Sequence, residues 1–137
     1  MLTSVTFHLA VRDYVFLLEN NYPQKSILKL VGDRYSLTGT ERTVLYRGIH
    51  IQSDNEKRFS KLTSPQEAKG LGLYIDTLNV LLSVVSYLNG NFVFISTDGY
   101  LRDASEYHGK AIKEELLERA AHFIVDSLLK LDIKTIH

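Results

Sequence analysis

Cysteine is absent from this 137-residue sequence, proline occurs only twice, and no long hydrophobic run is present. The lack of cysteine excludes disulfides, zinc-thiolate sites and thiol nucleophiles. No run reaches the roughly 20 apolar residues of a membrane-spanning helix. The opening stretch MLTSVTFHLAVRDYVF has no basic leader followed by a long apolar segment, so no secretory signal is expected. These absences predict a soluble, cytoplasmic protein.

An excess of one charge is also missing, since 16 Lys and Arg balance 16 Asp and Glu. Net charge therefore predicts no general attraction to nucleic acid or to a membrane, although local patches remain possible. The length suits one compact domain, or a small domain with a helical annex.

Residues 1–51 have the apolar spacing of helices, as in Val5, Leu9, Phe16 and Leu17. Pro23 suits the first turn of a second helix. Thr38 and Glu41 have the spacing of a capping box at the start of a third. The pattern predicts a helical annex of about three helices. The apolar residues expected to be buried in it are Phe16, Leu17, Leu28, Leu30 and Leu45.

Residues 52–70 are polar and contain the other proline, so we expect a linker there. Residues 71–137 alternate short apolar runs with helical patterns. The runs LGLYID, NFVFIST and IKTIH are predicted strands, DGYLRDASEYHG is a predicted loop or short helix, and two helices lie between them. This order predicts the α/β fold class, with the helical annex followed by a small parallel sheet.

Acidic residues follow the first two predicted strands. Asp76 ends LGLYID and Asp98 follows NFVFIST, so in one parallel sheet both would lie on the same rim. Converging carboxylates suit Mg²⁺ or Mn²⁺. The pattern predicts Asp76 and Asp98 as metal ligands, Asp103 as a third catalytic acid, and Asn79 as the residue that orients a carboxylate or a metal-bound water.

Other interpretations remain open at these positions. Asp76 is a favoured type of helix cap, and Asp98 with Gly99 is an ordinary turn signal. His108 is a candidate base or metal ligand, and with Lys110 and Arg102 it is also a candidate phosphate contact. In a third interpretation the second and third helices form a helix-turn-helix, and the arginines that would meet DNA phosphates are Arg34, Arg42 and Arg47.

Three stretches carry a resemblance to a known family: NYPQKSILKLVGDRYSLTGTERTVLYRGI, IDTLNVLL and DGYLRDASEYHG. In this order they resemble the largely archaeal family called domain of unknown function 434. The resemblance implies a helical N-terminal part followed by a small α/β domain. Members of that family continue past the last strand, whereas this chain stops at His137. A site that needs an acid from that region would require a second chain.

The α/β part is in turn similar to PIN and NYN nuclease domains, in which the first strand ends in an Asp with an Asn three residues later. Asp76 and Asn79 match this pattern, whereas Thr77 and Leu78 replace its glycine and aromatic residue. The similarity implies a divalent-metal-dependent phosphodiesterase acting on RNA, in which the metal activates water. The alternative is a non-catalytic module that binds RNA, a nucleotide or a protein. An uncovered edge strand at IKTIH also predicts a homodimer.

Overall fold

The computed structural model describes residue 2, residues 4–104 and residues 112–137. Within them the chain forms seven helices and four short strands, so the fold is mixed α/β and mostly helical. These elements fall into two compact units. Unit 1 contains the described residues up to Lys61 together with Phe94–Ala104, and unit 2 contains Leu62–Val93 and the described residues from 112 onward.

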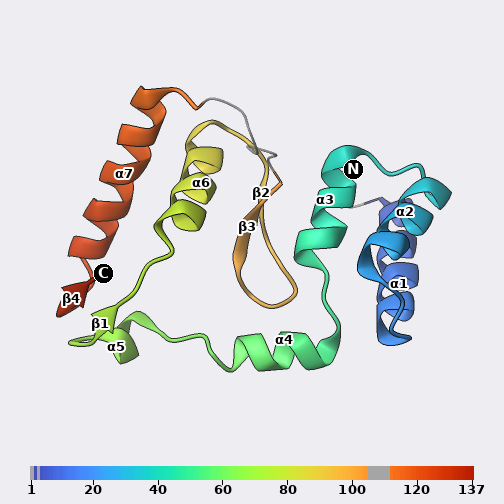
Figure 1. The fold of residues 1–137 in the computed structure, drawn as a ribbon, viewed down its shortest axis with the longest axis horizontal. Helices are drawn as coiled ribbons and strands as arrows, with labels where there is room; N and C mark the ends of the chain where they lie inside the picture. Colours follow the sequence, from blue (N-terminus) through green and yellow to red (C-terminus); the bar gives the residue numbers. More distant parts are fainter. Residues whose placement is uncertain (1, 3, 105–111) are drawn as a thin grey trace. The chain divides into compact units, whose positions relative to one another are not determined.

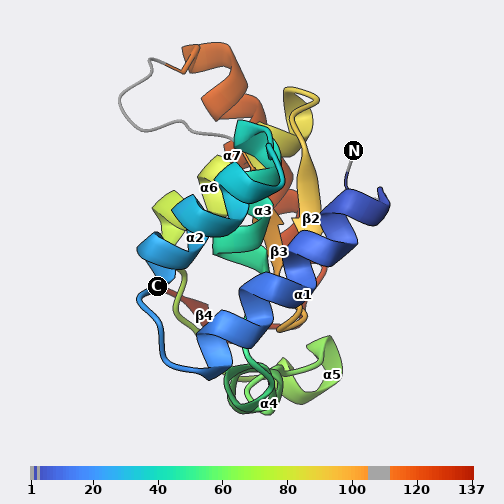
Figure 2. The same cartoon turned by 90° about the vertical axis from the view of Figure 1, so that its right-hand side faces the viewer.

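Three helices form the core of unit 1. They are α1 (Val5–Glu19), α2 (Gln24–Arg34) and α3 (Gly39–Gly48), and they pack against one another, as Figures 1 and 2 show. The capping box expected at the third helix is present. Hydrogen bonds from the backbone N–H and the hydroxyl of Thr38 lower the pKa of Glu41 to about 2. The three predicted helices of the annex are therefore confirmed.

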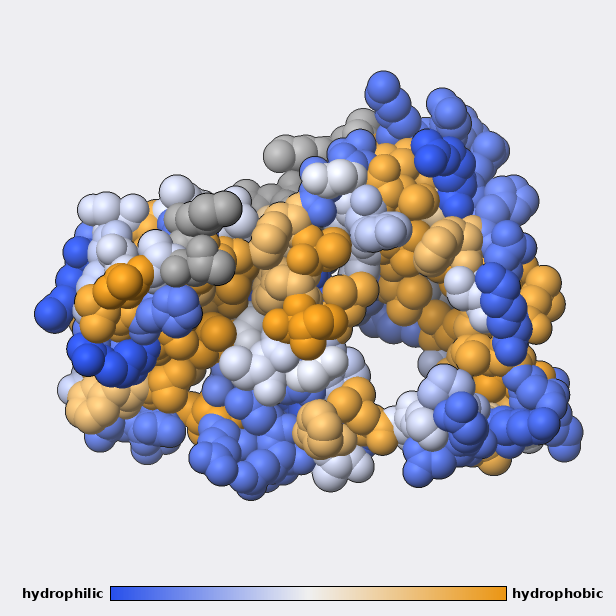
Figure 3. Space-filling model, turned by 180° about the vertical axis from the view of Figure 1, so that it is seen from behind, coloured by the Kyte–Doolittle hydropathy of each residue, from blue (hydrophilic) through white to orange (hydrophobic). Residues whose placement is uncertain are grey.

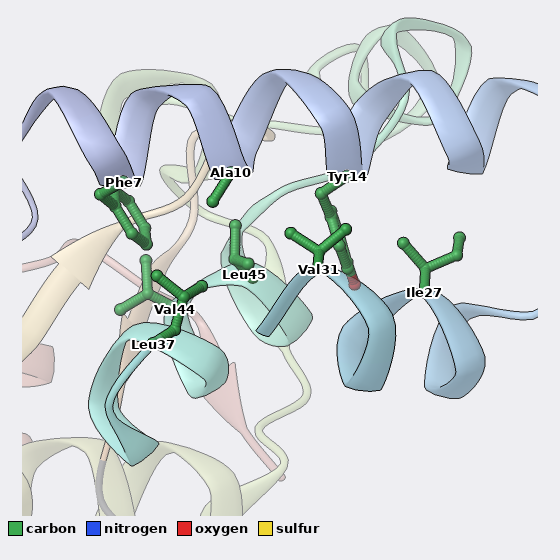
Figure 4. Packing of buried hydrophobic residues seen from close by; sticks show 8 residues of the cluster. All are labelled: Phe7, Ala10, Tyr14, Ile27, Val31, Leu37, Val44 and Leu45. Carbon is green, nitrogen blue, oxygen red and sulfur yellow. The ribbon is translucent and has the colours of Figure 1, made fainter. Parts of the chain in front are cut away.

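The core of unit 1 is a single apolar cluster between these helices (Figure 4). Its members come from α1, α2, α3 and the turn before α3: Phe7, Ala10, Tyr14, Ile27, Val31, Leu37, Val44 and Leu45. Burial of such side chains contributes about 1.5 to 3 kcal/mol each for the larger ones. This cluster fixes the arrangement on which the site of unit 1 depends.

The expected burial is confirmed for Leu45 but wrong for Phe16 and Leu30, which are 61% and 60% exposed. Leu17 and Leu28 are half-buried against the core. The buried face of α1 runs instead through Phe7, Ala10 and Tyr14. The helix has apolar residues on more than one face, and packing against α2 and α3 decides which face is buried.

Two further pieces complete unit 1. Helix α4 (Gln52–Phe59) lies in the stretch expected to be a linker. Strands β2 (Val93–Ile95) and β3 (Leu101–Asp103) pair as a hairpin, because only five residues connect them. Gly99 in the connection has a φ of 84°, which glycine adopts without strain. The hairpin is held to α3, since Thr97 N–H donates to the carbonyl of Gly48 at 2.8 Å.

Unit 2 has a parallel pair of strands and two packed helices. Strand β1 (Gly72–Leu73) pairs with β4 (Thr135–Ile136), with Gly72 opposite Thr135. Between them along the chain, α6 (Thr77–Leu88) and α7 (Glu114–Leu129) pack side by side (Figure 1). The short helix α5 (Pro65–Ala68) precedes β1. A parallel strand pair is thus present, although the sequence did not predict that the first and last runs would pair with each other.

The single parallel sheet with a PIN-like start is not what the described residues form. They form two separate two-stranded sheets, β1 with β4 and β2 with β3. The stretch expected to be a loop or short helix after Asp98 contributes β3 instead. The tight turn at Gly99 lets β2 pair with its sequence neighbour, and this local pairing needs no crossover helix.

Few side chains of unit 2 are fully buried, and several large apolar ones reach the surface. Figure 3 shows hydrophobic residues on the surface over α6 and α7, and Leu78, Tyr87 and Leu129 are more than half exposed. None of the helices in the described part of the chain combines the length and the hydropathy that crossing a membrane would require.

Candidate functional site

The most constrained polar group of unit 1 is the carboxylate of Asp98, which has no exposed surface. It lies in the hairpin turn, where its Oδ1 accepts hydrogen bonds from the hydroxyl of Ser96 and from the N–H of Tyr100. Its Oδ2 accepts from Nη1 of Arg58 at 2.8 Å and from Nη2 of Arg102 at 2.7 Å. Four donors therefore surround one buried carboxylate, which is about the number that its lone pairs accept.

These donors determine the charge state of Asp98. Burial alone would raise the pKa of a carboxyl group. The hydrogen bonds from Ser96, Arg58 and Arg102 outweigh burial and hold the pKa of Asp98 below its ordinary value. Asp98 is therefore ionised at neutral pH, and it ties α4, through Arg58, to the hairpin.

His50 lies beside this pair, with its Nε2 3.1 Å from Nη1 of Arg58 and 3.4 Å from Oδ2 of Asp98. Burial and the positive charge of Arg58 lower the pKa of His50, so the imidazole is neutral at pH 7. Because a guanidinium only donates, Nε2 accepts from Arg58 and the proton lies on Nδ1. His50 and Asp98 consequently do not form an ion pair at neutral pH.

His50 and Arg58 also line a cleft of about 430 Å³ on unit 1. Its volume lies in the range of small-molecule sites. The cleft is bounded by the end of α1, the turn before α2 and the first residue of α2, the end of α3 and both ends of α4. Besides His50 and Arg58, its lining residues are Leu18, Asn21, Tyr22, Gln24, Tyr46, Ile49, Ile51 and Asp54.

Arg58 is the cation on the wall of this cleft. Its side chain is 43% exposed, and its side-chain hydrogen bonds to described residues both use Nη1. No group within the described ranges accepts a hydrogen bond from its Nε or Nη2. Contacts on one side fix the plane of this guanidinium, and its remaining N–H donors have no acceptor among the described residues. Such an arginine is suited to bind a carboxylate or a phosphate.

The predicted catalytic residues fall in both units. Asp76 is in unit 2, where it caps α6 and accepts from the N–H of Asn79 at 3.4 Å and from its Nδ2 at 2.6 Å. Asp98, Asp103 and Arg102 are in unit 1. His108 and Lys110 lie outside the described residues. The cap interpretation of Asp76 and the turn interpretation of Asp98 both match the local geometry.

A metal site shared by Asp76 and Asp98 stays a prediction. The reason given for it, that both acids follow neighbouring strands of one sheet, is wrong, because β1 and β2 belong to different sheets. The oxygens of Asp98 are already engaged by two guanidiniums, a hydroxyl and an N–H. Among the described side chains, no group of three or more His, Cys, Asp or Glu is placed to hold a metal ion. The donors around Asp98 do not fit Mg²⁺ or Mn²⁺ in this arrangement.

The remaining candidate residues make internal contacts. Asp103 is buried and accepts from Nη1 of Arg47 at 3.3 Å. Nη2 of Arg42 lies 2.9 Å from the carboxylate of Asp33, and Nε of Arg34 lies 3.9 Å from that of Asp13. The three arginines of the helix-turn-helix interpretation thus all have protein partners.

Sequence reasoning missed His50 and Arg58 as site residues. Arg58 lies in the polar stretch expected to be a linker, and 40 positions separate it from Asp98. His50 has no metal-ligand spacing with the other histidines of the sequence. No periodicity or motif in the sequence connects either residue with the turn at Asp98.

Comparisons with known proteins share one boundary with the structure, which lies just after Lys61. A model described as "Protein of unknown function (DUF434)" matches residues 6–61, and one described as "Domain of unknown function (DUF5616)" matches residues 65–137. The resemblance to the first family is thus confirmed for the helical part, while the later stretches quoted for it fall within the second match.

A curated relative resembles the chain, and no solved structure matches it. The relative is an uncharacterized protein of Methanocaldococcus jannaschii, 27% identical over 127 residues that cover 93% of this chain and 61% of the relative. The chain thus spans about three fifths of the length of that relative. Since the second match covers more than half of the residues of this chain, the chain belongs to the DUF5616 family, and residues 6–61 before that domain match the DUF434 model.

Proposed function

We propose that this chain is a non-catalytic binding module, and that the cleft of unit 1 binds a phosphate-bearing ligand through Arg58. The observation that carries the proposal is the guanidinium of Arg58, which Asp98 and His50 hold on one side and which keeps Nε and Nη2 open on the other. Two such donors match two oxygens of a phosphate group.

The charges around Arg58 support this choice of ligand. Asp98 is paired with two guanidiniums, Arg58 and Arg102, so this cluster carries one net positive charge. His50 is neutral beside it and leaves this charge unchanged. An anion at Arg58 would compensate the excess positive charge in a partly buried setting, where electrostatic attraction is less screened than in bulk water.

The state of His50 supports binding rather than catalysis. A general base needs a free lone pair directed at the proton that it removes. The lone pair on Nε2 already accepts from Arg58, and Nδ1 carries the proton. The imidazole in this state helps to orient Arg58 and offers no base.

The test is isothermal titration calorimetry with ribose 5-phosphate, on the wild type and on two matched variants. Arg58→Lys keeps the charge beside Asp98 but loses the guanidinium fork, so binding is expected to weaken about tenfold or more. Arg102→Lys makes the same change at the other partner of Asp98, which does not line the cleft, and is expected to bind like the wild type.

Two results would contradict the proposal. One is the absence of saturable binding to the wild type, and the other is an equal loss of affinity in both variants. The metal-dependent ribonuclease, with Asp76, Asp98 and Asp103 as its acids, stays the alternative hypothesis. Cleavage of single-stranded RNA that needs Mn²⁺ and disappears in Asp76→Asn would favour it.

A further inference from the structure

The cleft of unit 1 contains two tyrosines in addition to Arg58. Tyr22 follows α1 and is 58% exposed, and Tyr46 on α3 is 38% exposed. Most aromatic rings of a folded domain lose their surface to the core, as Tyr14 does in this unit. Two partly exposed rings on the wall of a polar cleft offer flat apolar surface to a planar ligand group.

Gln24 adds an acceptor to the same cleft. Its Nε2 donates to the hydroxyl of Tyr14 and to the carbonyl of Tyr46, each at 3.0 Å. Because that carbonyl only accepts, the nitrogen of the amide must face it, and Oε1 is the atom left over. No donor within the described ranges reaches Oε1, so it is available to a ligand N–H.

Asp54 places a carboxylate in the cleft, one helical turn before Arg58 on α4. No cation in the described part of the chain pairs with it. A carboxylate repels a ligand that carries negative charge along its whole length. It accepts hydrogen bonds, however, from the hydroxyls of a sugar. The cleft is thus suited to a ligand with an anionic end and a neutral part that donates hydrogen bonds.

We infer that the ligand of this cleft is a mononucleotide, with its phosphate on Arg58, its sugar hydroxyls on Asp54 and its base against Tyr22 or Tyr46. This inference rests on the proposed function and names the ligand class of the same site. The balanced charge of the chain and the carboxylate in the cleft favour a mononucleotide over RNA, because tight binding of a polyanion relies on many phosphate contacts from Lys and Arg.

The test compares adenosine 5′-monophosphate, ribose 5-phosphate and adenosine by calorimetry on the full chain. The monophosphate is expected to bind at least tenfold more tightly than either of its parts, because only it engages both Arg58 and a tyrosine ring. The monophosphates of guanosine, cytidine and uridine are measured alongside, because stacking alone tolerates every base whereas Oε1 of Gln24 favours bases with an amino group.

Variants of the chain distinguish the contribution of the base to binding from that of the phosphate. Tyr22→Leu is expected to lower the affinity for the monophosphate about tenfold and to leave ribose 5-phosphate unchanged. Tyr74→Leu, at an 81% exposed position of unit 2 outside the cleft, is the matched control and is expected to change neither. Both tyrosines are exposed, so neither change is expected to unfold the chain.

The outcomes distinguish this inference from the proposed function. Equal affinity for ribose 5-phosphate and the monophosphate, with no effect of Tyr22→Leu, would overturn the mononucleotide and leave the phosphate site standing. Tighter binding of a single-stranded RNA 10-mer than of the monophosphate, after correction for the number of nucleotides, would also overturn it. Failure of every phosphate-bearing probe would contradict the proposed function itself.

Discussion

Asp98 is a fully buried carboxylate whose two guanidinium partners reach solvent in part. Asp98→Asn keeps its size but removes the charge that compensates Arg58 and Arg102. We expect a loss of about 3 kcal/mol in the free energy of unfolding, the lower end for a broken buried ion pair, because both arginines keep some contact with water. Chemical denaturation of the variant and the wild type measures this loss.

The matched control is Asp33→Asn, at a 61% exposed carboxylate that pairs with Arg42 at 2.9 Å. Surface pairs of this kind contribute at most about 1 kcal/mol. If both substitutions had the same small effect, Asp98 would not be the anchor that the contacts around it indicate.

His50 makes the stability of unit 1 depend on pH. Its pKa in the folded chain lies below the ordinary value of 6.5, because burial and Arg58 disfavour the charged form. As the pH falls below 6.5 the unfolded chain takes up this proton first, so the free energy of unfolding decreases until the pH has passed the folded pKa. Asp98, whose pKa is also lowered, adds a further loss below pH 3.8.

Denaturation at pH 8, 7, 6 and 5 tests the contribution of His50. His50→Gln is expected to flatten the dependence over this range, whereas His122→Gln, at an exposed position of α7, is expected to retain the wild-type slope. An unchanged slope in His50→Gln would show that the imidazole is not the titrating group.

The sequence predicted the turn at Asp98 and Gly99 but not the partners of the acid. An Asp-Gly pair signals a turn through its own backbone preferences. Arg58 lies 40 positions before Asp98 in the sequence. Its contact with Asp98 depends on how α4 and the hairpin pack against α3, and no local sequence pattern predicts this packing. The prediction that Asp98 is a metal ligand therefore followed from a sheet order that the described residues do not have.

At the scale of elements, the hairpin packs closely against the end of α3. A Cβ at Gly48 would overlap the ring of Phe94 on β2. Gly48→Ala is expected to lower the free energy of unfolding by about 1 to 3 kcal/mol, because the ring has to move in a packed environment. Gly39→Ala, at the start of the same helix with no atom near its Cβ, is the control and is expected to be neutral or stabilising.

Asp76 caps the N-terminus of helix α6, and its carboxylate accepts from the N–H and the side chain of Asn79. Asp76→Ala is expected to cost about 1 kcal/mol of stability, whereas Asp76→Asn, nearly as good a cap, is expected to cost less than half of that. Melting temperatures of both variants measure the difference. Equal losses in both variants would contradict this explanation, because an asparagine cap would then have no advantage over alanine.

Helices were easier to predict than strands in this chain. Thr38 and Glu41 are three positions apart and cap their helix by themselves, so the start of α3 follows from a local rule. The apolar run LGLYID contributes only two residues to β1, and its partner β4 lies about 60 positions later. Strand pairing depends on distant segments, and the identity of the partner is not encoded in the run itself.

At the scale of the whole molecule, the two family matches and the two units divide the chain differently in one segment. The DUF434 match contains every residue that lines the cleft, but Asp98 and Asp103 lie in the DUF5616 match and fold into unit 1. The guanidinium of Arg58 in the cleft is therefore held by a residue from the other match. The predicted homodimer and the predicted role of Asp76 in RNA cleavage stay predictions beside this account.

The central claim, that the cleft of unit 1 binds a phosphate-bearing ligand through Arg58, is tested most directly by nuclear magnetic resonance. Adenosine 5′-monophosphate is titrated into ¹⁵N-labelled protein while the Nε–H of Arg58 and the amides of Tyr22, Tyr46 and His50 are followed. Saturable shifts are expected at these groups, and they are expected to be lost in Arg58→Lys and kept in Arg102→Lys. Shifts confined to the residues around Asp76, or none that saturate, would contradict it.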